Sequence, residues 1–241
     1  MDITLLSLLT AGLITGFSKF SVGGMGLLIL PVLMIAFPGT QALGILIPIY
    51  IITDLMAIAM YRKDIAWPVL ARLLPVGFVG VALGGWLLSE INTEMFTMML
   101  GITIVLIVVL GVWLDHKPAK FMRHPTSAYI TGLCAGFVSL IANAAGPLFS
   151  LFMMEQRLSK EAYVSTRAWG FLIINLAKVP VLWFLGLVNW QTTLVSLQCL
   201  PGLIVGAAIG YQLLRHLKLN QFKWLIRLMA TIAAIKLFAF S

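Results

Sequence analysis

The chain has 241 residues, of which 61% are hydrophobic and only 10% are charged, and its mean hydropathy is +1.05. Soluble domains average about 45–50% apolar and about 25% charged residues, so this composition excludes a soluble globular fold and indicates an integral membrane protein. The formal net charge of +8 does not indicate a nucleic-acid surface, because the Lys and Arg residues stand in short clusters between apolar runs, as in the cytoplasmic loops of membrane proteins.

The first apolar segment, residues 3–37, is too long for one membrane span and too short for two, since a spanning helix needs about 20 residues. Small residues interrupt it between Ser21 and Gly26. Residues 126–154 are likewise too long for one span and too short for two, and small residues interrupt them between Ala142 and Pro147. We predict that each segment is a re-entrant helical hairpin or a broken helix. Its irregular tip must be buried in protein or face a polar cavity.

Six other segments are long and apolar enough to span a membrane: 41–61, 68–89, 95–114, 163–186, 191–214 and 221–240. Each half of the chain then contains one hairpin followed by three spans. We predict a first membrane repeat over 1–114, a cytoplasmic linker over 115–125 and a second repeat over 126–241. The N-terminal segment lacks a basic start and a cleavage site, so we expect it to be a retained membrane segment.

Glycine and proline spacings support a repeat. Gly12 and Gly16 of the first hairpin recur as Gly132 and Gly136 of the second. The spacing of Pro75, Gly80 and Gly84 recurs in Pro201, Gly206 and Gly210. For these later glycines, close helix packing is the favoured interpretation.

The basic clusters also predict how the halves are oriented. They lie in the connections near Arg62, Lys117, Arg157 and Arg215, whereas 90–94 and 187–190 contain no Lys or Arg. Placing the basic connections in the cytoplasm leaves both termini outside and gives the two halves opposite sidedness. The predicted fold is therefore an all-α integral membrane protein made of two inverted-topology repeats.

Matched, glycine-interrupted segments in two halves indicate where a transporter binds its substrate. In the first tip, Lys19 and backbone N–H groups of the small residues would form a cradle for an anion; the candidate residues are Ser18, Lys19, Ser21, Gly23, Gly24 and Gly26. Alternatively, Lys19 lies near a membrane interface because the hairpin is shallow. In the second tip, Asn143 and Gly146 are the candidates, against a turn that is merely packed.

The helix predicted over 163–186 contributes Arg167, Asn175 and Lys178, which share one helical face. An ionisable residue within the membrane is a functional candidate, although snorkelling or helix pairing would also explain these side chains. Asp54 is an acid well within a span and is a candidate proton carrier; it would equally serve as an ion-pair partner of Lys178 or Lys19. The chain shows no metal-binding spacing, no cofactor motif and no nucleotide-binding P-loop, so we expect no enzyme and no direct use of ATP.

The glycine frames, the stretch Gly23-Gly24-Met25-Gly26, Pro31 and the run Lys160-Glu161-Ala162 leading to Thr166 resemble the TauE/SafE family over nearly the whole chain. The second tip departs from the pattern because it lacks a double glycine. The resemblance implies an inner-membrane exporter of sulfite or organosulfonates, with the lipid bilayer and a small sulfur-containing anion as partners. A homodimer is a candidate assembly. An anion channel and a non-transporting membrane scaffold are the alternatives.

Overall fold

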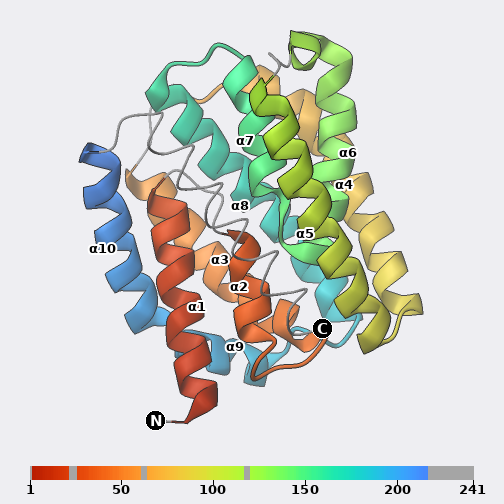
Figure 1. The fold of residues 1–241 in the computed structure, drawn as a ribbon, viewed down its shortest axis with the longest axis vertical. Coiled ribbons are helices and arrows are strands. Elements are labelled where there is room, and N and C mark those ends of the chain that lie inside the picture. Colours follow the sequence, from red (N-terminus) through yellow and green to blue (C-terminus); the bar gives the residue numbers. More distant parts are fainter. Residues whose placement is uncertain (1, 22–25, 61–63, 117–119, 217–241) are drawn as a thin grey trace.

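The computed structural model describes residues 2–21, 26–60, 64–116 and 120–216, in which every regular element is a helix. The order along the chain is α1 (Ile3–Phe20), α2 (Gly26–Leu33), α3 (Gln41–Met60), α4 (Trp67–Glu90), α5 (Thr93–His116), the 3₁₀ helix η1 (Lys120–Arg123), α6 (Pro125–Ala142), α7 (Ala145–Glu155), α8 (Lys160–Phe184), α9 (Trp190–Leu197) and α10 (Leu200–His216) (Figure 1). Five of these helices are long and apolar enough to cross a membrane, or six if α9 and α10 form one broken span. The predicted span 221–240 lies outside the described residues. The protein is a multi-pass helical membrane protein.

The two predicted hairpins are each built from two helices. The first arms, α1 and α6, have 18 residues each, which is enough to cross a membrane. The second arms, α2 and α7, have 8 and 11 residues and extend only about 12 and 16 Å at 1.5 Å per residue. In the second hairpin the reversal is made at Asn143, whose φ of 51° is left-handed and ends α6.

The segment 191–214, predicted as one continuous span, is broken into α9 and α10, which are bent by 50° relative to each other. Pro201 has no N–H to donate to the carbonyl of Leu197, so the helix cannot continue through this point without a lost hydrogen bond. The N–H groups of Gln198 and Cys199 instead bond to residues three positions earlier and close α9 with a tighter turn.

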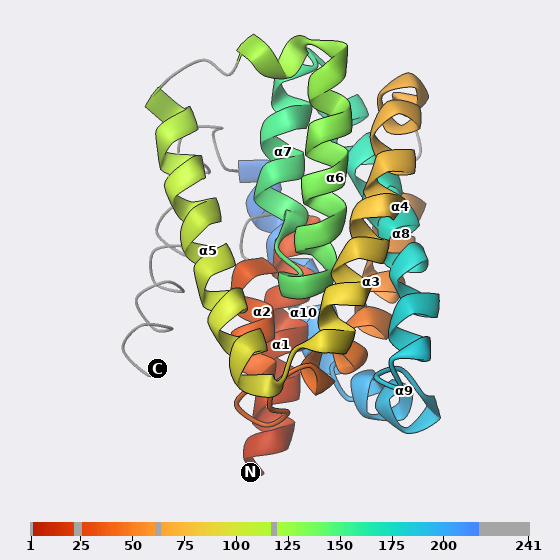
Figure 2. The ribbon, with the colours of Figure 1, turned by 90° about the vertical axis from the view of Figure 1, so that its right-hand side faces the viewer.

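The repeated glycines allow helices of the two halves to pack backbone against backbone. A Cβ atom on Gly16 of α1 would lie 2.1 Å from the carbonyl oxygen of Leu203 in α10. A Cβ atom on Gly136 of α6 would lie 2.0 Å from the carbonyl oxygen of Gly77 in α4. Figure 1 shows α1 beside α10, and Figure 2 shows α6 beside α4. The packing interpretation of the later glycines is confirmed as well, since Gly206 has no room for a Cβ atom beside α1.

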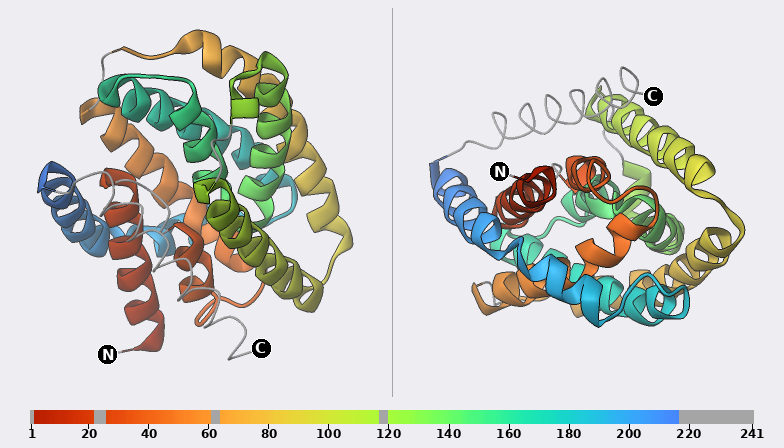
Figure 3. Two further views of the ribbon diagram at one scale, coloured as in Figure 1. Left: turned by 45° about the horizontal axis from the view of Figure 1, so that its top comes forward. Right: turned by 90° about the horizontal axis from the view of Figure 1, so that it is seen from below.

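The two hairpins lie inside an arc of other helices. Viewed from below, α10, α9, α4 and α5 surround the hairpins (Figure 3). Helix α3 packs against α8 and also contacts α1, and α8 further contacts α4, α6 and α7. Because α3 and α8 touch both hairpins between them, polar side chains on these two helices are placed to meet the hairpin tips.

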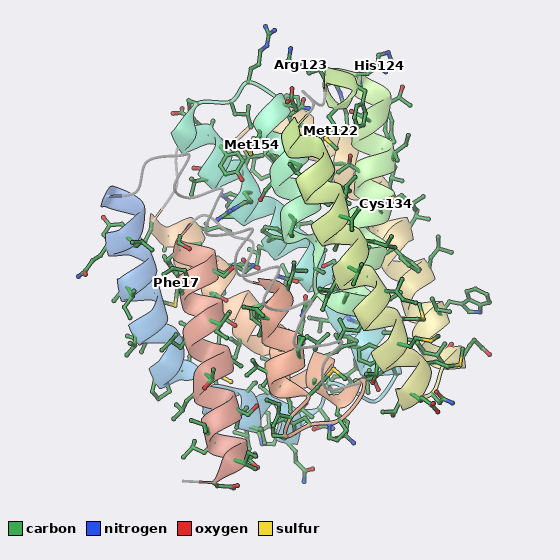
Figure 4. The ribbon with its side chains drawn as sticks, in the orientation of Figure 1. Phe17, Met122, Arg123, His124, Cys134 and Met154 are labelled. Atoms are coloured by element: carbon green, nitrogen blue, oxygen red, sulfur yellow. The ribbon has the colours of Figure 1, made fainter. Side chains whose placement is uncertain are left out.

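The linker η1 is attached to the far end of the second hairpin. Arg123 Nε donates to Glu155 Oε2 at 2.9 Å, and Gln156 Nε2 donates to the carbonyl of Met122 at 2.9 Å. Met122, Arg123 and His124 lie at the same end of the molecule as Met154 of α7 (Figure 4). The linker therefore packs against the end of α7 opposite the hairpin tip.

Gly136→Ala is expected to destabilise the protein, because the new methyl group would meet backbone that has no rotamer to change. Overpacking of this kind costs about 1–3 kcal/mol, which a thermal unfolding curve of the detergent-solubilised protein would detect. Gly146→Ala is the matched control, since no atom from another part of the described chain lies within 4 Å of a Cβ atom there. Equal melting temperatures for the two variants would contradict the packing argument.

Candidate functional site

A cavity of about 50 Å³, measured as the space open to the centre of a water-sized sphere, lies between the two hairpin tips and helices α3 and α8. This volume has room for more than one water molecule, since a single water needs about 10–15 Å³. Its lining contains residues from α1, α2, α3, α6, α7 and α8. The cavity is therefore a meeting point of both halves of the chain.

The first turns of two half-length helices border this cavity. Gly26 and Leu27 come from the start of α2, and Ala145, Gly146 and Pro147 come from the start of α7. The first N–H groups of a helix have no partner within the helix and carry partial positive charge, so each of these ends favours an anion. No atom from another part of the described chain lies within 4 Å of a Cβ atom built on Gly146, at the start of α7.

Lys19, near the end of α1, forms an ion pair with Asp54 of α3 at the edge of the cavity. Its Nζ atom lies 4.8 Å from the ring centroid of Tyr50 and 4.6 Å from that of Phe171, distances at which an ammonium is attracted to an aromatic face. The second carboxylate oxygen of Asp54 accepts a hydrogen bond of 2.6 Å from Asn175 Nδ2. Lys19 thus joins the first hairpin to α3, and Asp54 joins α3 to α8.

Helix α8 supplies two further buried cations. Lys178, which is 1% exposed, donates to the carbonyl of Ser139 at 3.1 Å, to Ser139 Oγ at 3.2 Å and to Asn143 Oδ1 at 2.7 Å. Arg167, which is 5% exposed, donates through Nη2 to the carbonyls of Ser21 at 3.3 Å and Lys19 at 3.5 Å. Within the described part of the chain, three basic side chains and one acidic side chain therefore line the cavity or bond to residues that line it, and two helix N-termini add to this positive character.

Most of the site residues predicted from the sequence lie at this cavity. Seven of them line it: Ser18, Lys19, Gly26, Asn143, Gly146, Arg167 and Asn175. Three others lie one contact away and bond to lining residues, namely Ser21, Asp54 and Lys178. Gly23 and Gly24 lie outside the described residues.

Among the lining residues that were not predicted as site residues, Tyr50, Ser150 and Phe171 contribute a hydroxyl group or an aromatic ring. Each of these three residues stands four positions from a predicted site residue, a spacing that places two side chains on the same helical face. The pairs are Tyr50 with Asp54, Ser150 with Gly146, and Phe171 with Arg167. Ser150 Oγ is buried and has no hydrogen-bond partner within the described residues. A buried hydroxyl without a partner is available to a ligand in the cavity.

Gly146→Ala is expected to preserve the fold and to weaken the binding of an anion that approaches the start of α7, because the added methyl group has room but projects into the cavity there. We expect the dissociation constant of the anion to rise about tenfold, which corresponds to ~1.4 kcal/mol and lies within the cost of a small steric misfit. Isothermal titration of the purified variant measures this change. An unchanged dissociation constant would mean that the anion does not approach this turn.

A family model described as "Sulfite exporter TauE/SafE" matches residues 8–237. No curated protein and no solved structure matches the chain. The family match covers nearly the whole sequence, and it agrees with a multi-pass helical protein whose half-length helices point at a buried, basic cavity. The chain belongs to the TauE/SafE sulfite exporter family, a family of membrane transporters.

Proposed function

We propose that the protein is a secondary transporter that moves a small anion of the sulfite or organosulfonate class across the inner membrane by alternating access. The observation that supports this most directly is the cavity, where the starts of α2 and α7 converge with Lys19 and Arg167. Half-helix N-termini that point at an anionic substrate near the repeat interface are a recurring feature of secondary transporters. A cavity with these donors is matched to an anion rather than to a cation.

In this proposal the anion lies between the two hairpin tips. Gly26 and Gly146 let it approach the helix starts, and Lys19 and Arg167 supply full positive charge. The hydroxyl and amide groups of Ser18, Asn143 and Asn175 border the same space and complete the polar lining. The proposed set also includes Ser21 and Lys178, which bond to lining residues, and Gly23 and Gly24, which lie outside the described residues.

We propose that the two halves, 1–114 and 126–241, are inverted repeats joined by a cytoplasmic linker, with both termini outside. The packing of the hairpins supports this arrangement. Gly12 of α1 packs against the carbonyl of Cys199, which stands two residues before Pro201. Its counterpart Gly132 packs against the carbonyl of Leu73, which stands two residues before Pro75. Glycines at equivalent positions of the two halves therefore pack against equivalent positions of the opposite half.

We propose that transport is coupled to protons through Asp54. Among the described residues the carboxylate partner of Lys19 is Asp54, and an anion that enters the cavity would compete with Asp54 for this ammonium. A buried carboxylate that loses its cation is costly and is relieved by taking up a proton. The anion and the proton would therefore bind together and move in the same direction.

The first experiment is a thermal-shift screen of the detergent-solubilised protein with sulfite, sulfonates, sulfate and carboxylates. An anion present at 100 times its dissociation constant adds about 2.7 kcal/mol of stability. Flux of the stabilising anion in proteoliposomes should then saturate with its concentration. Large ohmic currents would identify a channel instead, and the absence of stabilisation by every anion would contradict a transport function.

A further inference from the structure

We propose that Arg167 and Lys178 are positioning residues that neutralise the negative ends of the two hairpin helices α1 and α6, so that the cavity between the tips can accept an anion. The proposal rests on the proposed anion site and assigns both cations a role at the helix ends, which for Arg167 comes in addition to its place in the cavity lining. Each cation donates to a carbonyl at the C-terminal end of the first arm of a hairpin. Both cations come from α8.

At the second hairpin the contact follows from the way α6 ends. In a continuing helix the carbonyl of Ser139 would accept from the N–H of Asn143, but that N–H bonds to Val138 because Asn143 is left-handed. Lys178 Nζ donates to the Ser139 carbonyl instead, and its other N–H groups donate to Ser139 Oγ and Asn143 Oδ1. All three donors of the ammonium are therefore used within the protein. Lys178 is buried and does not line the cavity.

At the first hairpin Arg167 makes the corresponding contact. Helix α1 ends at Phe20, and the carbonyls of Lys19 and Ser21 at this end both accept from Arg167 Nη2. Arg167 and Lys178 are eleven residues apart, which is about three helical turns and keeps both on one face of α8. One helix thus supplies a cation to the end of each hairpin arm.

The physical need for these cations lies in the geometry of a hairpin tip. Each tip brings the C-terminal end of one helix next to the N-terminal start of the next, and these ends carry opposite partial charges. Beside an anion site the negative ends of α1 and α6 would repel the ligand. A cation on each negative end leaves the positive starts of α2 and α7 to dominate the field in the cavity.

The test uses sulfite transport in proteoliposomes with Lys178→Gln, which removes the charge and keeps a hydrogen-bond donor for Asn143. We expect its KM for sulfite to rise about tenfold or more with little change in kcat, since a cation at a helix end contributes free energies of this size when partly buried. Lys178→Arg should restore the KM to within about threefold of the wild type by the same reasoning. Leu182→Met, a volume-conserving change at a buried position of the same helix, is the control and should leave KM unchanged.

A second measurement separates an electrostatic role from a change of cavity shape. Sulfate and methanesulfonate have similar size but carry two and one negative charges, and both are used as competitors of sulfite transport. Coulomb energy is proportional to charge, so the factor by which Lys178→Gln weakens sulfate should be about the square of the factor for methanesulfonate. Equal factors would overturn the proposal, because a change of cavity shape would weaken two anions of similar size equally, whatever their charge.

Arg167→Gln allows the same charge comparison at the first hairpin if the Lys178 variant does not fold, and equal factors for sulfate and methanesulfonate in this variant would also overturn the proposal. A wild-type KM in folded Lys178→Gln would overturn the proposal, as would a structure with bound anion in which Lys178 Nζ contacts the anion. These outcomes are distinct from failure of the proposed function, in which the wild-type protein itself would neither bind nor transport any anion.

Discussion

Lys19→Met is expected to destabilise the protein and to abolish anion transport. The substitution leaves Asp54 buried with Asn175 as its remaining hydrogen-bond partner among the described residues, and removing one member of a buried ion pair costs about 3–5 kcal/mol. It also removes the ammonium that borders the cavity. Thermal unfolding and sulfite flux in proteoliposomes measure the two effects separately.

The double variant Lys19→Met, Asp54→Asn distinguishes the two roles of Lys19. It removes both charges, and the new amide oxygen still accepts from Asn175, so we expect most of the lost stability to return. Transport should remain absent because the cation is still missing. If the double variant transports normally, Lys19 is only a structural partner of Asp54 and the proposed site is wrong.

The exposed ion pair between Arg123 and Glu155 provides the control for the cost of burial. Its side chains are 42% and 20% exposed, and such pairs contribute about 0–1 kcal/mol. Arg123→Met should therefore change the melting temperature far less than Lys19→Met. A comparable loss of stability in the two variants would contradict the assignment of a buried pair at Lys19.

Much of the helical architecture was predictable from apolar length and from small residues. The two segments of intermediate length were correctly expected to break, and α3, α4, α5 and α8 begin and end within a few residues of the predicted spans. The break between α9 and α10 was not predictable from the proline pattern. Pro75 and Pro201 stand in the same spacing, yet α4 continues through Pro75 whereas the chain breaks before Pro201. A proline in the sequence shows only that one backbone donor is absent. The surrounding packing determines whether the helix bends there.

Charged and polar residues in apolar surroundings were sufficient to indicate most of the candidate site. Burial of Lys19, Arg167 or Lys178 is expensive, so their presence in spans indicated a polar interior without any knowledge of contacts. The sequence does not distinguish a cation that faces the cavity from one that bonds to a helix end, because both positions require the same residue type. For Lys178 the sequence leaves a site role, snorkelling and helix pairing as alternatives, and the structure shows contacts with Ser139 and Asn143.

The missed lining residues have side chains that are ordinary in a membrane helix. Tyr50 and Phe171 add to the apolar character of their segments, and Ser150 is a single small polar residue among apolar neighbours. In the sequence, only their position four residues from a predicted site residue distinguishes them from similar side chains elsewhere in the chain. This spacing becomes informative once the facing helices are known, since only then does one helical face become the wall of a cavity.

Asp54→Asn is expected to separate anion binding from proton coupling. The carboxylate of Asp54 pairs with Lys19 through one oxygen and accepts from Asn175 through the other, and an amide at this position keeps an acceptor but cannot exchange a proton. Without the carboxylate, an anion has less competition for Lys19, so binding should be no weaker than in the wild type. Exchange of labelled for unlabelled anion across the vesicle membrane should therefore persist.

Net uptake driven by a pH gradient should disappear in Asp54→Asn. With the outside one pH unit more acidic, one coupled proton supports about a tenfold accumulation of the anion inside wild-type vesicles, and none in the variant. Methanesulfonate is a suitable probe because it stays singly charged across this range, so the gradient acts on the protein and not on the protonation of the anion. Accumulation by the variant equal to that of the wild type would exclude Asp54 as the proton carrier. Loss of both accumulation and exchange would mean that Asp54 is needed for the anion site itself, because the ion pair with Lys19 would then be what keeps the ammonium at the cavity.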